Sequence, residues 1–378
     1  MKRQTRSPRP KAPGPGFPRP VRRAPPPDRP VTSRPRLGLL GVGWIGRSRM
    51  KAIVESGVAE IAALVDIDPV RAEEARASAP GAVLFESYGE MLEADLDGVV
   101  IATPSAGHAD QSIVALERGL PVFCQKPLGR NAVEAAAVVR AAEHRNRLLG
   151  VDLSYRFLKA SKAVRDLVRS GEIGRVYAAD LIFHNAYGPD QPWYYDPVRS
   201  GGGCVMDLGV HLVDFLFWCL DRPGVRSVNA RLFSGGRRLR IPSQRVEDYA
   251  DVRIDLEDEV CARVACSWNL HAGRDAFCQV IFYGTNGSAL LRNVAGSFYD
   301  FRAEHWLGTE TTTLVEPPDP WGGRAVLAWA NRIARNGGAF DPVAWEFVDT
   351  AETLDAIYRS GSSDIGATYA SVSPTVTR

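Results

Sequence analysis

The chain has 378 residues, of which 45% are hydrophobic and 24% are charged, and its formal net charge is +2. A chain of this length can form two hydrophobic cores of ordinary domain size. It contains no run of 18 apolar residues, so we expect no membrane-spanning segment. The six cysteines form no C-x-x-C pair and accompany no histidine cluster, which argues against a metal site and predicts reduced thiols in a cytoplasmic protein.

Residues 1–36 differ in composition from the rest of the chain. Pro, Arg and Lys dominate, and no apolar periodicity appears before Leu37, so this segment is predicted to be a disordered basic tail. It holds 11 Lys or Arg and a single acid, Asp28, which leaves the remaining chain with a net charge of −8. The body is therefore acidic, and nucleic acid is not an expected partner. Binding of RNA or a membrane surface by the tail is the weaker alternative.

An apolar stretch over 37–41 leads into the pattern G-x-G-x-x-G, formed by Gly41, Gly43 and Gly46. This pattern is typical of a dinucleotide site. The first glycine allows a tight turn, the second lets the backbone approach a pyrophosphate, and the third lets the next helix pack closely on the strand. The N–H groups at the start of that helix would face the phosphates.

A second apolar run, 61–65, ends in Asp66, 20 residues after Gly46. A carboxylate at this spacing is expected to bind the hydroxyls of the adenosine ribose. It would repel a 2′-phosphate, and no arginine directly follows it, so the sequence favours NAD over NADP. The alternative is a solvated aspartate at the end of a strand.

Apolar strands alternate with amphipathic helices between residues 37 and 155. Asn131 is a plausible N-cap for a helix over 131–145. The alternation predicts a parallel sheet with right-handed crossovers, and hence a Rossmann domain over 37–155. Its predicted strands are 37–41, 61–66, 98–102, 121–124 and 148–153.

The periodicity changes after a helix predicted over 161–170. The following β-rich segments are joined by short turns and predict an open, mostly antiparallel sheet in a C-terminal α/β domain over 156–342. An apolar helix over 206–220 interrupts these strands, and a final helix in 343–362 is expected to return to the domain interface. The predicted strands are 175–186, 225–234, 246–256, 259–268, 276–284 and 287–292.

Three further segments carry residues suited to chemistry. The stretch A-T-P-S-A-G-H, 102–108, and the stretch F-C-Q-K-P, 123–127, follow strands at the carboxyl edge of the first sheet, where ligands of such folds bind. The third is G-G-G-C-V-M-D-L-G-V-H, 201–211, at the start of the apolar helix. The helical spacing of Asp207, His211 and Asp214 would place their side chains on one face.

The order of these motifs resembles the Gfo/Idh/MocA family of oxidoreductases, over about 37–362. The resemblance implies a Rossmann domain followed by an α/β domain whose open sheet forms homo-oligomer contacts, as a dimer or tetramer. It also implies a cis bond between Lys126 and Pro127 and a sugar, cyclitol or related polyol as substrate. Two residues depart from the family pattern: Gln125 stands where Glu is usual, and Lys159 where Pro is common.

Oxidation of a secondary alcohol requires a base that removes the hydroxyl proton while hydride leaves the carbon. His211 is the predicted general base, and Asp207 would fix its tautomer or relay the proton. Lys126 would bond the reacting oxygen and stabilise the developing alkoxide. The predicted cofactor-binding residues are Gly41, Gly43, Trp44, Ile45, Gly46, Asp66, Thr103, Pro104, His108, Gln125 and Lys126.

The substrate is expected to meet residues of a strand and loop facing the pocket. Aromatic faces together with hydrogen-bonding groups suit sugar recognition. His108 is ambiguous at this point, because capping of a helix explains it as well as cofactor contact does. The predicted substrate-binding residues are Tyr155, Arg156, His184, Trp193, Tyr195, Asp207 and His211.

Two other functions are compatible with these motifs. A family relative can use bound NAD transiently for glycoside cleavage or epimer-type chemistry, with no net redox change. A cofactor-binding sensor can keep the fold without the activity. The presence of both Lys126 and His211 argues against the sensor.

Overall fold

The computed structural model describes residues 34–241, 244–362 and 367–368. Most of the predicted tail therefore lies outside the described residues. The predicted end of the tail, residue 36, lies slightly too far along the chain, because Arg36 already begins the first strand and its backbone N–H donates to Asp97.

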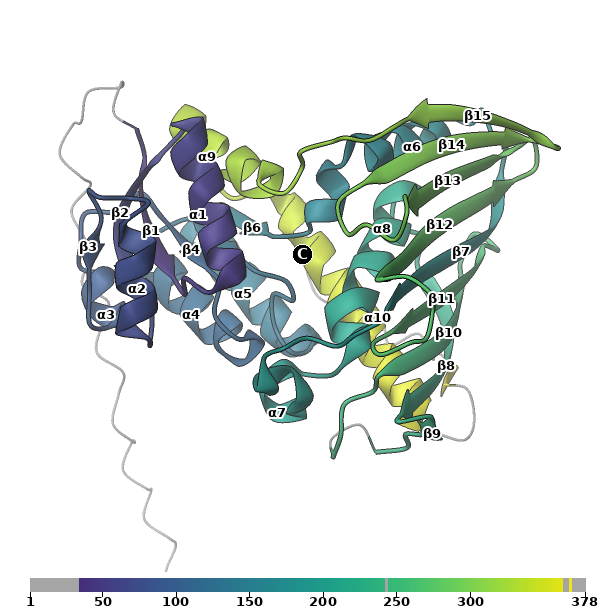
Figure 1. Ribbon diagram of the computed structural model, residues 1–378, viewed down its shortest axis with the longest axis horizontal. Coiled ribbons are helices and arrows are strands. Elements are labelled where there is room, and N and C mark those ends of the chain that lie inside the picture. The colour runs from purple at the N-terminus through teal and green to yellow at the C-terminus, as the bar shows by residue number, and fades with distance from the viewer. Residues whose placement is uncertain (1–33, 242–243, 363–366, 369–378) are drawn as a thin grey trace, which may run out of the picture. The chain divides into compact units, whose positions relative to one another are not determined.

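The first sheet is parallel throughout, with strand order β3-β2-β1-β4-β5-β6, as the alternating pattern predicted (Figure 1). This order reverses between β1 and β4, and that reversal creates the crevice in which doubly wound sheets bind nucleotides. The strands are β1 (Arg36–Leu40), β2 (Glu60–Val65), β3 (Val83–Leu84), β4 (Gly98–Ile101), β5 (Val122–Cys124) and β6 (Leu149–Val151).

The helices of this half begin where the sequence offers caps. Asp68 accepts hydrogen bonds from two backbone N–H groups of α2, and Asn131 caps α5 through Glu134 N, as predicted. The helix α5 ends at Asn146 in the left-handed conformation. The helices are α1 (Trp44–Ser56), α2 (Pro69–Arg76), α3 (Tyr88–Met91), α4 (Ser105–Glu117) and α5 (Ala132–Arg145).

The second sheet has ten strands and is antiparallel except where β11 pairs with β7. It follows the order β15-β14-β13-β12-β7-β11-β10-β8-β16, and β9 pairs with β8. Its strands are β7 (Val176–Asn185), β8 (Val225–Ser234), β9 (Arg237–Arg238), β10 (Tyr249–Leu256), β11 (Cys261–Ser267), β12 (Ala276–Gly284), β13 (Ser288–Asn293), β14 (Phe301–Leu307), β15 (Glu310–Val315) and β16 (Ala367–Thr368).

Helices cover one face of this sheet. Buried and more exposed side chains alternate along β8 and β10, so the opposite face carries the polar set. The final helix α10 contacts both β8 and the first-sheet helix α5. The covering helices are α6 (Lys159–Ser170), α8 (Val210–Leu220) and α10 (Glu346–Ser362), and the short turns are η1 (Ser154–Phe157), η2 (Pro192–Tyr195), α7 (Pro197–Ser200), η3 (Val205–Gly209) and η4 (Pro342–Trp345).

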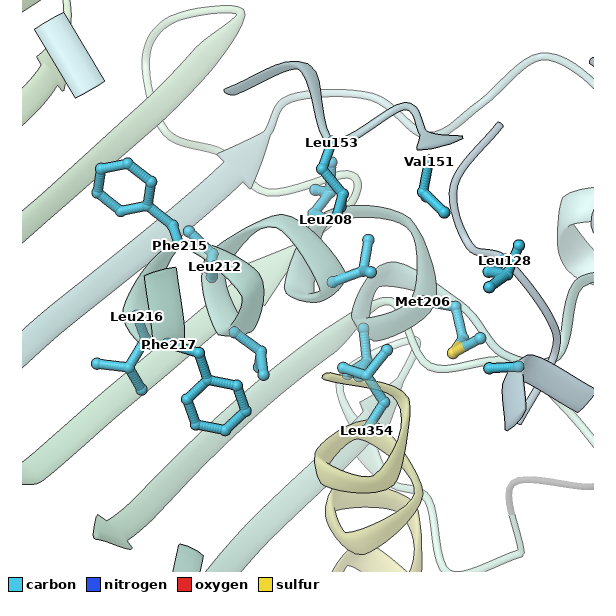
Figure 2. Packing of buried hydrophobic residues seen from close by; sticks show 14 of the residues in the cluster. Leu128, Val151, Leu153, Met206, Leu208, Leu212, Phe215, Leu216, Phe217 and Leu354 are labelled. Carbon is cyan, nitrogen blue, oxygen red and sulfur yellow. The ribbon is translucent and has the colours of Figure 1, made fainter. Parts of the chain in front are cut away.

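The apolar helix predicted over 206–220 has a more complex start than expected, because η3 is a π turn that leads into α8. The stretch Pro197–Leu220 is long and apolar enough to cross a membrane, but 78% of its most apolar part is buried inside the protein. Figure 2 shows this packing, in which Met206 and Leu354 lie near Leu128 and Val151 of the first half. The loop that follows β5 therefore rests on a shared apolar core.

The helix α9 (Arg324–Asn336) corrects the predicted extent of the second domain. No helix was predicted here, and these residues were assigned to the second domain, 156–342, yet Trp329 packs against Phe123 of β5, with ring centroids 5.8 Å apart. Two glycines make room for this indole. A Cβ would lie 2.9 Å from Trp329 at Gly98 and 3.0 Å from it at Gly150. The chain thus returns to the first sheet after β15.

We expect Trp329→Ala to destabilise the protein by about 3–5 kcal/mol, because the indole is buried and Gly98 and Gly150 cannot fill the space that it leaves. Urea unfolding measures this change. Val343→Ala is the control, since that side chain is half exposed. A loss below 1 kcal/mol for Trp329→Ala would show that α9 does not stabilise the first sheet.

Candidate active site

The glycine turn between β1 and α1 has the geometry that a dinucleotide requires. Gly41 adopts φ +88°, which a side chain rarely tolerates, and a Cβ on Gly46 would lie 2.1 Å from the Gly41 carbonyl oxygen. At Gly43, no described atom lies within 4 Å of the Cβ position, so the backbone is open to a ligand. The three glycines therefore have the three distinct environments that were predicted. Trp44, the first residue of α1, is 73% exposed beside this opening.

Asp66 lies at the end of β2 and binds the glycine turn directly. Its Oδ2 accepts a hydrogen bond from Val42 N at 2.7 Å, and its Oδ1 accepts one from Asp68 N at 3.0 Å. Arg71 of α2 forms an ion pair with Oδ1 at 3.7 Å. Although no arginine directly follows Asp66 in sequence, one turn of helix brings this guanidinium to it. Ile67 is 99% exposed at the same edge, where an apolar contact suits the face of an adenine.

His108 does not take the predicted place in contact with the cofactor. Its imidazole is buried, with Nδ1 2.7 Å from the Pro127 carbonyl oxygen and Nε2 2.8 Å from the Thr103 carbonyl oxygen. A neutral imidazole has one N–H, so one of these carbonyl oxygens accepts a hydrogen bond and the other contacts the ring. The ring therefore lies between two loops at the carboxyl edge of the sheet. Thr103 and Pro104 precede α4, and the Thr103 hydroxyl lies 2.5 Å from Gln111 Oε1. These backbone segments can border a cofactor, whereas the His108 ring positions them.

Gln125 lies beside a buried ion pair. Its amide donates a hydrogen bond to Asp152 Oδ2, which also accepts one from Arg49 Nε at 2.5 Å. Ser154 binds the second oxygen of Asp152 and also accepts from Arg49 at 3.1 Å. The carboxylate next to Gln125 therefore comes from the end of β6, and Arg49 of α1 balances its charge. Because the Gln125 nitrogen donates to Asp152, its carbonyl oxygen is the group left to accept a ribose hydroxyl.

Lys126, which follows β5 of the first sheet, contacts Asp207 in the π turn η3. Its Nζ lies 2.6 Å from Asp207 Oδ1 and 2.8 Å from the Asp207 carbonyl oxygen. The Trp268 indole N–H donates to Asp207 Oδ2 at 3.0 Å. Both carboxylate oxygens are therefore held, and the bond between Lys126 and Pro127 is cis, as the resemblance implied. Among the described residues, Asp207 is the acid in direct contact with Lys126.

His211 lies beside this pair but does not bond to Asp207. Its Nδ1 is buried and has no hydrogen-bond partner within the described ranges, so the predicted fixing of its tautomer by Asp207 is not present. Its ring packs edge-on against Tyr155 at 4.8 Å. Burial, together with the positive charges of Lys126 and Arg49, holds the pKa of His211 well below its usual value. The imidazole is therefore neutral at neutral pH.

Arg156 was predicted to bind substrate, and its guanidinium is instead engaged by two carboxylates. Its Nε donates to Asp214 Oδ2 at 2.8 Å and its Nη1 donates to Glu346 Oε2 at 2.9 Å. Asp214 thus points toward this ion pair, although it shares a helix with His211. Arg222 also contacts Glu346 at 3.0 Å, so the cluster joins α8 to α10. A buried charge requires such partners, which the local sequence could not reveal.

His184 lies on the wrong face of the second sheet for substrate contact. Its neighbour Phe183 is buried and packs against Tyr155 at 5.8 Å, so the alternation along β7 turns His184 to the opposite face. There His184 stacks on Tyr249 and its Nδ1 lies 2.8 Å from Ser267 Oγ. Burial lowers the pKa of His184 to about 4. The structure therefore does not bring His184 together with the predicted substrate residues Tyr155 and His211.

Aromatic rings gather around Trp268, which donates a hydrogen bond to Asp207. Trp193 stacks on Tyr194 with centroids 3.8 Å apart, and Tyr194 and Tyr195 contact the Trp268 ring edge-on. The predicted residues Trp193 and Tyr195 thus lie in one cluster that reaches Asp207 through Trp268. Such rings offer apolar faces and polar edges to a sugar.

Sequence reasoning missed two further site residues. Trp268, at the end of β11, binds Asp207, and Trp321 packs against Tyr155 at 5.2 Å. Neither belongs to a motif, and only the tertiary fold brings them to the site. A tryptophan at the end of an alternating strand is a weak signal that could have directed attention to Trp268.

Two family models cover most of the described chain. Residues 36–153 match the oxidoreductase family with an NAD-binding Rossmann fold, and residues 161–290 match the GFO/IDH/MocA C-terminal domain. Solved structures confirm the fold. GenD2 from gentamicin A biosynthesis, in complex with NAD, superposes with a TM-score of 0.75 at 23% identity and covers 91% of this chain and 98% of its own. Levoglucosan dehydrogenase with NADH and levoglucosan gives 0.76 at 21% identity, over 89% and 99%.

Curated relatives show closer sequence similarity. The rhizopine catabolism protein MocA of Rhizobium meliloti is 32% identical over 69% of this chain and 79% of its own length. An inositol 2-dehydrogenase of Acidiphilium cryptum is 33% identical over 68% and 73%, and a D-apiose dehydrogenase of Paraburkholderia graminis is 29% identical over 85% and 86%. With both domain models matched and the motif order in place, the chain belongs to the Gfo/Idh/MocA family of oxidoreductases.

Proposed function

We propose that the protein is a dehydrogenase that transfers a hydride between a nicotinamide cofactor and a secondary alcohol of a sugar, cyclitol or related polyol. The observation that carries this proposal is the 2.6 Å contact between Lys126 Nζ and Asp207 Oδ1, beside His211 and at the carboxyl edge of the first sheet. The relatives named for inositol and D-apiose support the same substrate class.

Each polar group of the site has a task in this reaction. Lys126 donates a hydrogen bond to the substrate oxygen and stabilises the negative charge that develops there. His211 is neutral, because burial lowers its pKa, and it accepts the hydroxyl proton. Asp207 holds Lys126 in place, and Trp268 fixes the second oxygen of Asp207. The cofactor, when bound, accepts the hydride.

The cofactor is proposed to be NAD rather than NADP. Asp66 carries a negative charge at the end of β2, where the hydroxyls of the adenosine ribose are expected. Its ion pair with Arg71 reduces that charge in part, but Arg71 is already engaged with Asp66 and Asp68. The open turn at Gly43 and the exposed Ile67 support the binding of a dinucleotide at this edge.

We propose further that the protein is a cytoplasmic homo-oligomer. Five of its six cysteines are buried and all six are free, which suits a reducing compartment. The face of the second sheet opposite the helices carries pairs such as Arg263 with Asp180 and Arg292 with Glu304. A sheet face that carries charges of both signs is suited to self-association with the same face of a second copy through a two-fold axis.

The first test is the absorbance of NADH during incubation with NAD and a panel of cyclitols, aldoses and sugar derivatives. We expect turnover with one substrate class and a loss of at least about 100-fold in kcat for Lys126→Ala, because a charge-stabilising donor is removed. Lys51→Ala is the matched control, since that lysine is exposed and forms an ion pair with Glu55 on the surface of α1.

The same measurement separates the rival functions. Turnover of a glycoside without added NAD, by protein purified with bound cofactor, would support the non-redox enzyme. Tight binding of NADH with no turnover of any substrate would support a sensor. Equal activity of the wild type and Lys126→Ala would contradict the assigned role of Lys126.

The pH dependence of kcat/KM tests the role of His211. Because burial and the nearby cations lower its pKa, the imidazole keeps its lone pair as the pH falls below 6.5. We therefore expect kcat/KM to remain constant down through pH 6.5 and to fall only at lower pH. His211→Ala should lose about 10²–10⁴-fold of the rate and this acid limb. A midpoint at or above pH 6.5 in the wild type would contradict this assignment.

The variant Asp66→Asn tests the cofactor preference. It retains an oxygen that accepts from Val42 N but removes the charge that repels a 2′-phosphate. We expect the ratio of kcat/KM for NAD to that for NADP to fall by about tenfold or more, which corresponds to 1.4 kcal/mol. The control is Asp68→Asn, which alters the cap of α2 next to the same arginine. An unchanged ratio would show that Asp66 does not select the cofactor.

A further inference from the structure

Glu247 is a fully buried acid that none of the functional motifs includes. Its Oε1 accepts three hydrogen bonds, from Gly203 N, Val205 N and the Tyr358 hydroxyl, each at 2.9 Å. Its Oε2 is buried and has no partner in the part of the chain that the structure describes. Burial raises the pKa of this carboxyl group. A buried carboxyl group with one unpaired oxygen lowers the stability of the fold, which points to another role for Glu247.

Three consecutive glycines, 201–203, precede η3, and this glycine triplet packs closely against Glu247. A Cβ on Gly203 would lie 1.9 Å from the Glu247 carbonyl oxygen, which also accepts a hydrogen bond from Cys204 N. A Cβ on Gly202 would lie 1.9 Å from the Tyr358 hydroxyl. The two glycines are therefore required for the chain to approach Glu247 and Tyr358, which is a role separate from any contact with a ligand.

The segment held in this way is the one that presents Asp207. The Asp207 backbone N–H donates to the Gly203 carbonyl oxygen at 3.0 Å, so the π turn begins on the residue that Glu247 binds. The loop that contains Glu247 and Asp248 also supports the side chain of Asp207, through Trp268. The backbone N–H of Trp268 donates to the Asp248 carbonyl oxygen at 2.8 Å, and the Trp268 indole binds Asp207.

We propose that Glu247, together with Tyr358, is a positioning pair that sets the distance between Asp207 and Lys126. This inference rests on the proposed dehydrogenase function. Glu247 acts on the turn through two backbone N–H groups at its start, and Tyr358 connects that turn to α10. Because α10 also packs on α5 of the first half, the pair links the Asp207 turn to the half of the protein that carries Lys126.

The carboxylate is suited to this task for a physical reason. A carboxylate shares its negative charge between two oxygens, and its Oε1 accepts from two backbone N–H groups and a hydroxyl together. Each bond to an ionised acceptor is stronger than one to a neutral acceptor. The first N–H groups of a helical segment also lack partners within the segment. A neutral side chain of the same shape holds them less firmly, which leaves the turn able to shift.

The test compares Glu247→Gln and Tyr358→Phe with Asp319→Asn. Asp319 is an equally suitable buried acid, because it holds Arg324 and the backbone N–H of Lys159 but contacts none of the glycine triplet. Stability, kcat and KM are measured for each, with NAD and myo-inositol as the first probe and the sugar panel in reserve. Crystal structures of the variants give the distance from Lys126 Nζ to Asp207 Oδ1.

We expect kcat to fall about 10- to 100-fold in Glu247→Gln and less in Tyr358→Phe, since a shift of about 1 Å in a reacting group has an effect of this size. The KM for NAD should change less than twofold, because the glycine turn of β1 is untouched. Asp319→Asn should lower stability without this fall in kcat. In the crystal structure of Glu247→Gln, the distance from Lys126 Nζ to Asp207 Oδ1 should exceed that in a wild-type crystal structure solved under the same conditions.

An unchanged distance in Glu247→Gln would overturn the proposal whatever the kcat, as would an equal fall in kcat for Asp319→Asn. A wild type that turns over no substrate in the panel would contradict the proposed function instead. In that case the distance measured in the Glu247→Gln structure still decides the positioning role, since it requires no activity.

Discussion

The ion pair between Lys126 and Asp207 is the contact on which the rest of the site depends, because it joins residues from different sheets. Lys126 follows the short strand β5, and Asp207 belongs to a π turn that opens the helix α8. Each group needs the other for hydride transfer, because a lysine without Asp207 would have neither a fixed orientation nor an opposite charge beside it. Much of the surrounding structure can be understood as support for this contact. His108 lies between the loops at Thr103 and Pro127. The apolar core around Leu128 packs against the loop that follows β5 (Figure 2).

Charge pairing explains why several polar residues do not face a ligand. Arg49 binds Asp152, and Arg156 binds Asp214 and Glu346, all at positions that are wholly or largely buried. An unpaired charge there would be strongly destabilising, so each guanidinium is held by a carboxylate from a distant element. The cluster around Asp152 has a second consequence. It places a carboxylate beside Gln125, so the amide is oriented in the same region where the family usually has an acid.

The elements that could be predicted are those whose signals are local. The glycine turn, the cap at Asn131 and the alternation of strands and helices depend on residues close in sequence, and each is found as expected. The edge strands β14 and β15 were not predicted, because β15 is a polar, exposed run without a clear alternation. The helix α9 was also missed, and its Trp329 finds its place only through Gly98 and Gly150. His184 was misplaced because a strand pattern gives two faces and does not say which one meets the helices.

By itself the sequence determined the dinucleotide turn and the order of the two sheets, because backbone freedom and hydrophobic period act over a few residues. The proposed roles of Lys126, Asp207 and His211 came instead from the resemblance to the family. Only the tertiary structure decided what these side chains touch. The partners of Asp207 and Arg156 are 61 and 190 residues away, and they meet through packing of helices on sheets. Contacts of that kind follow from the geometry of the assembled layers, in which burial forces each polar group to find a partner wherever the fold provides one.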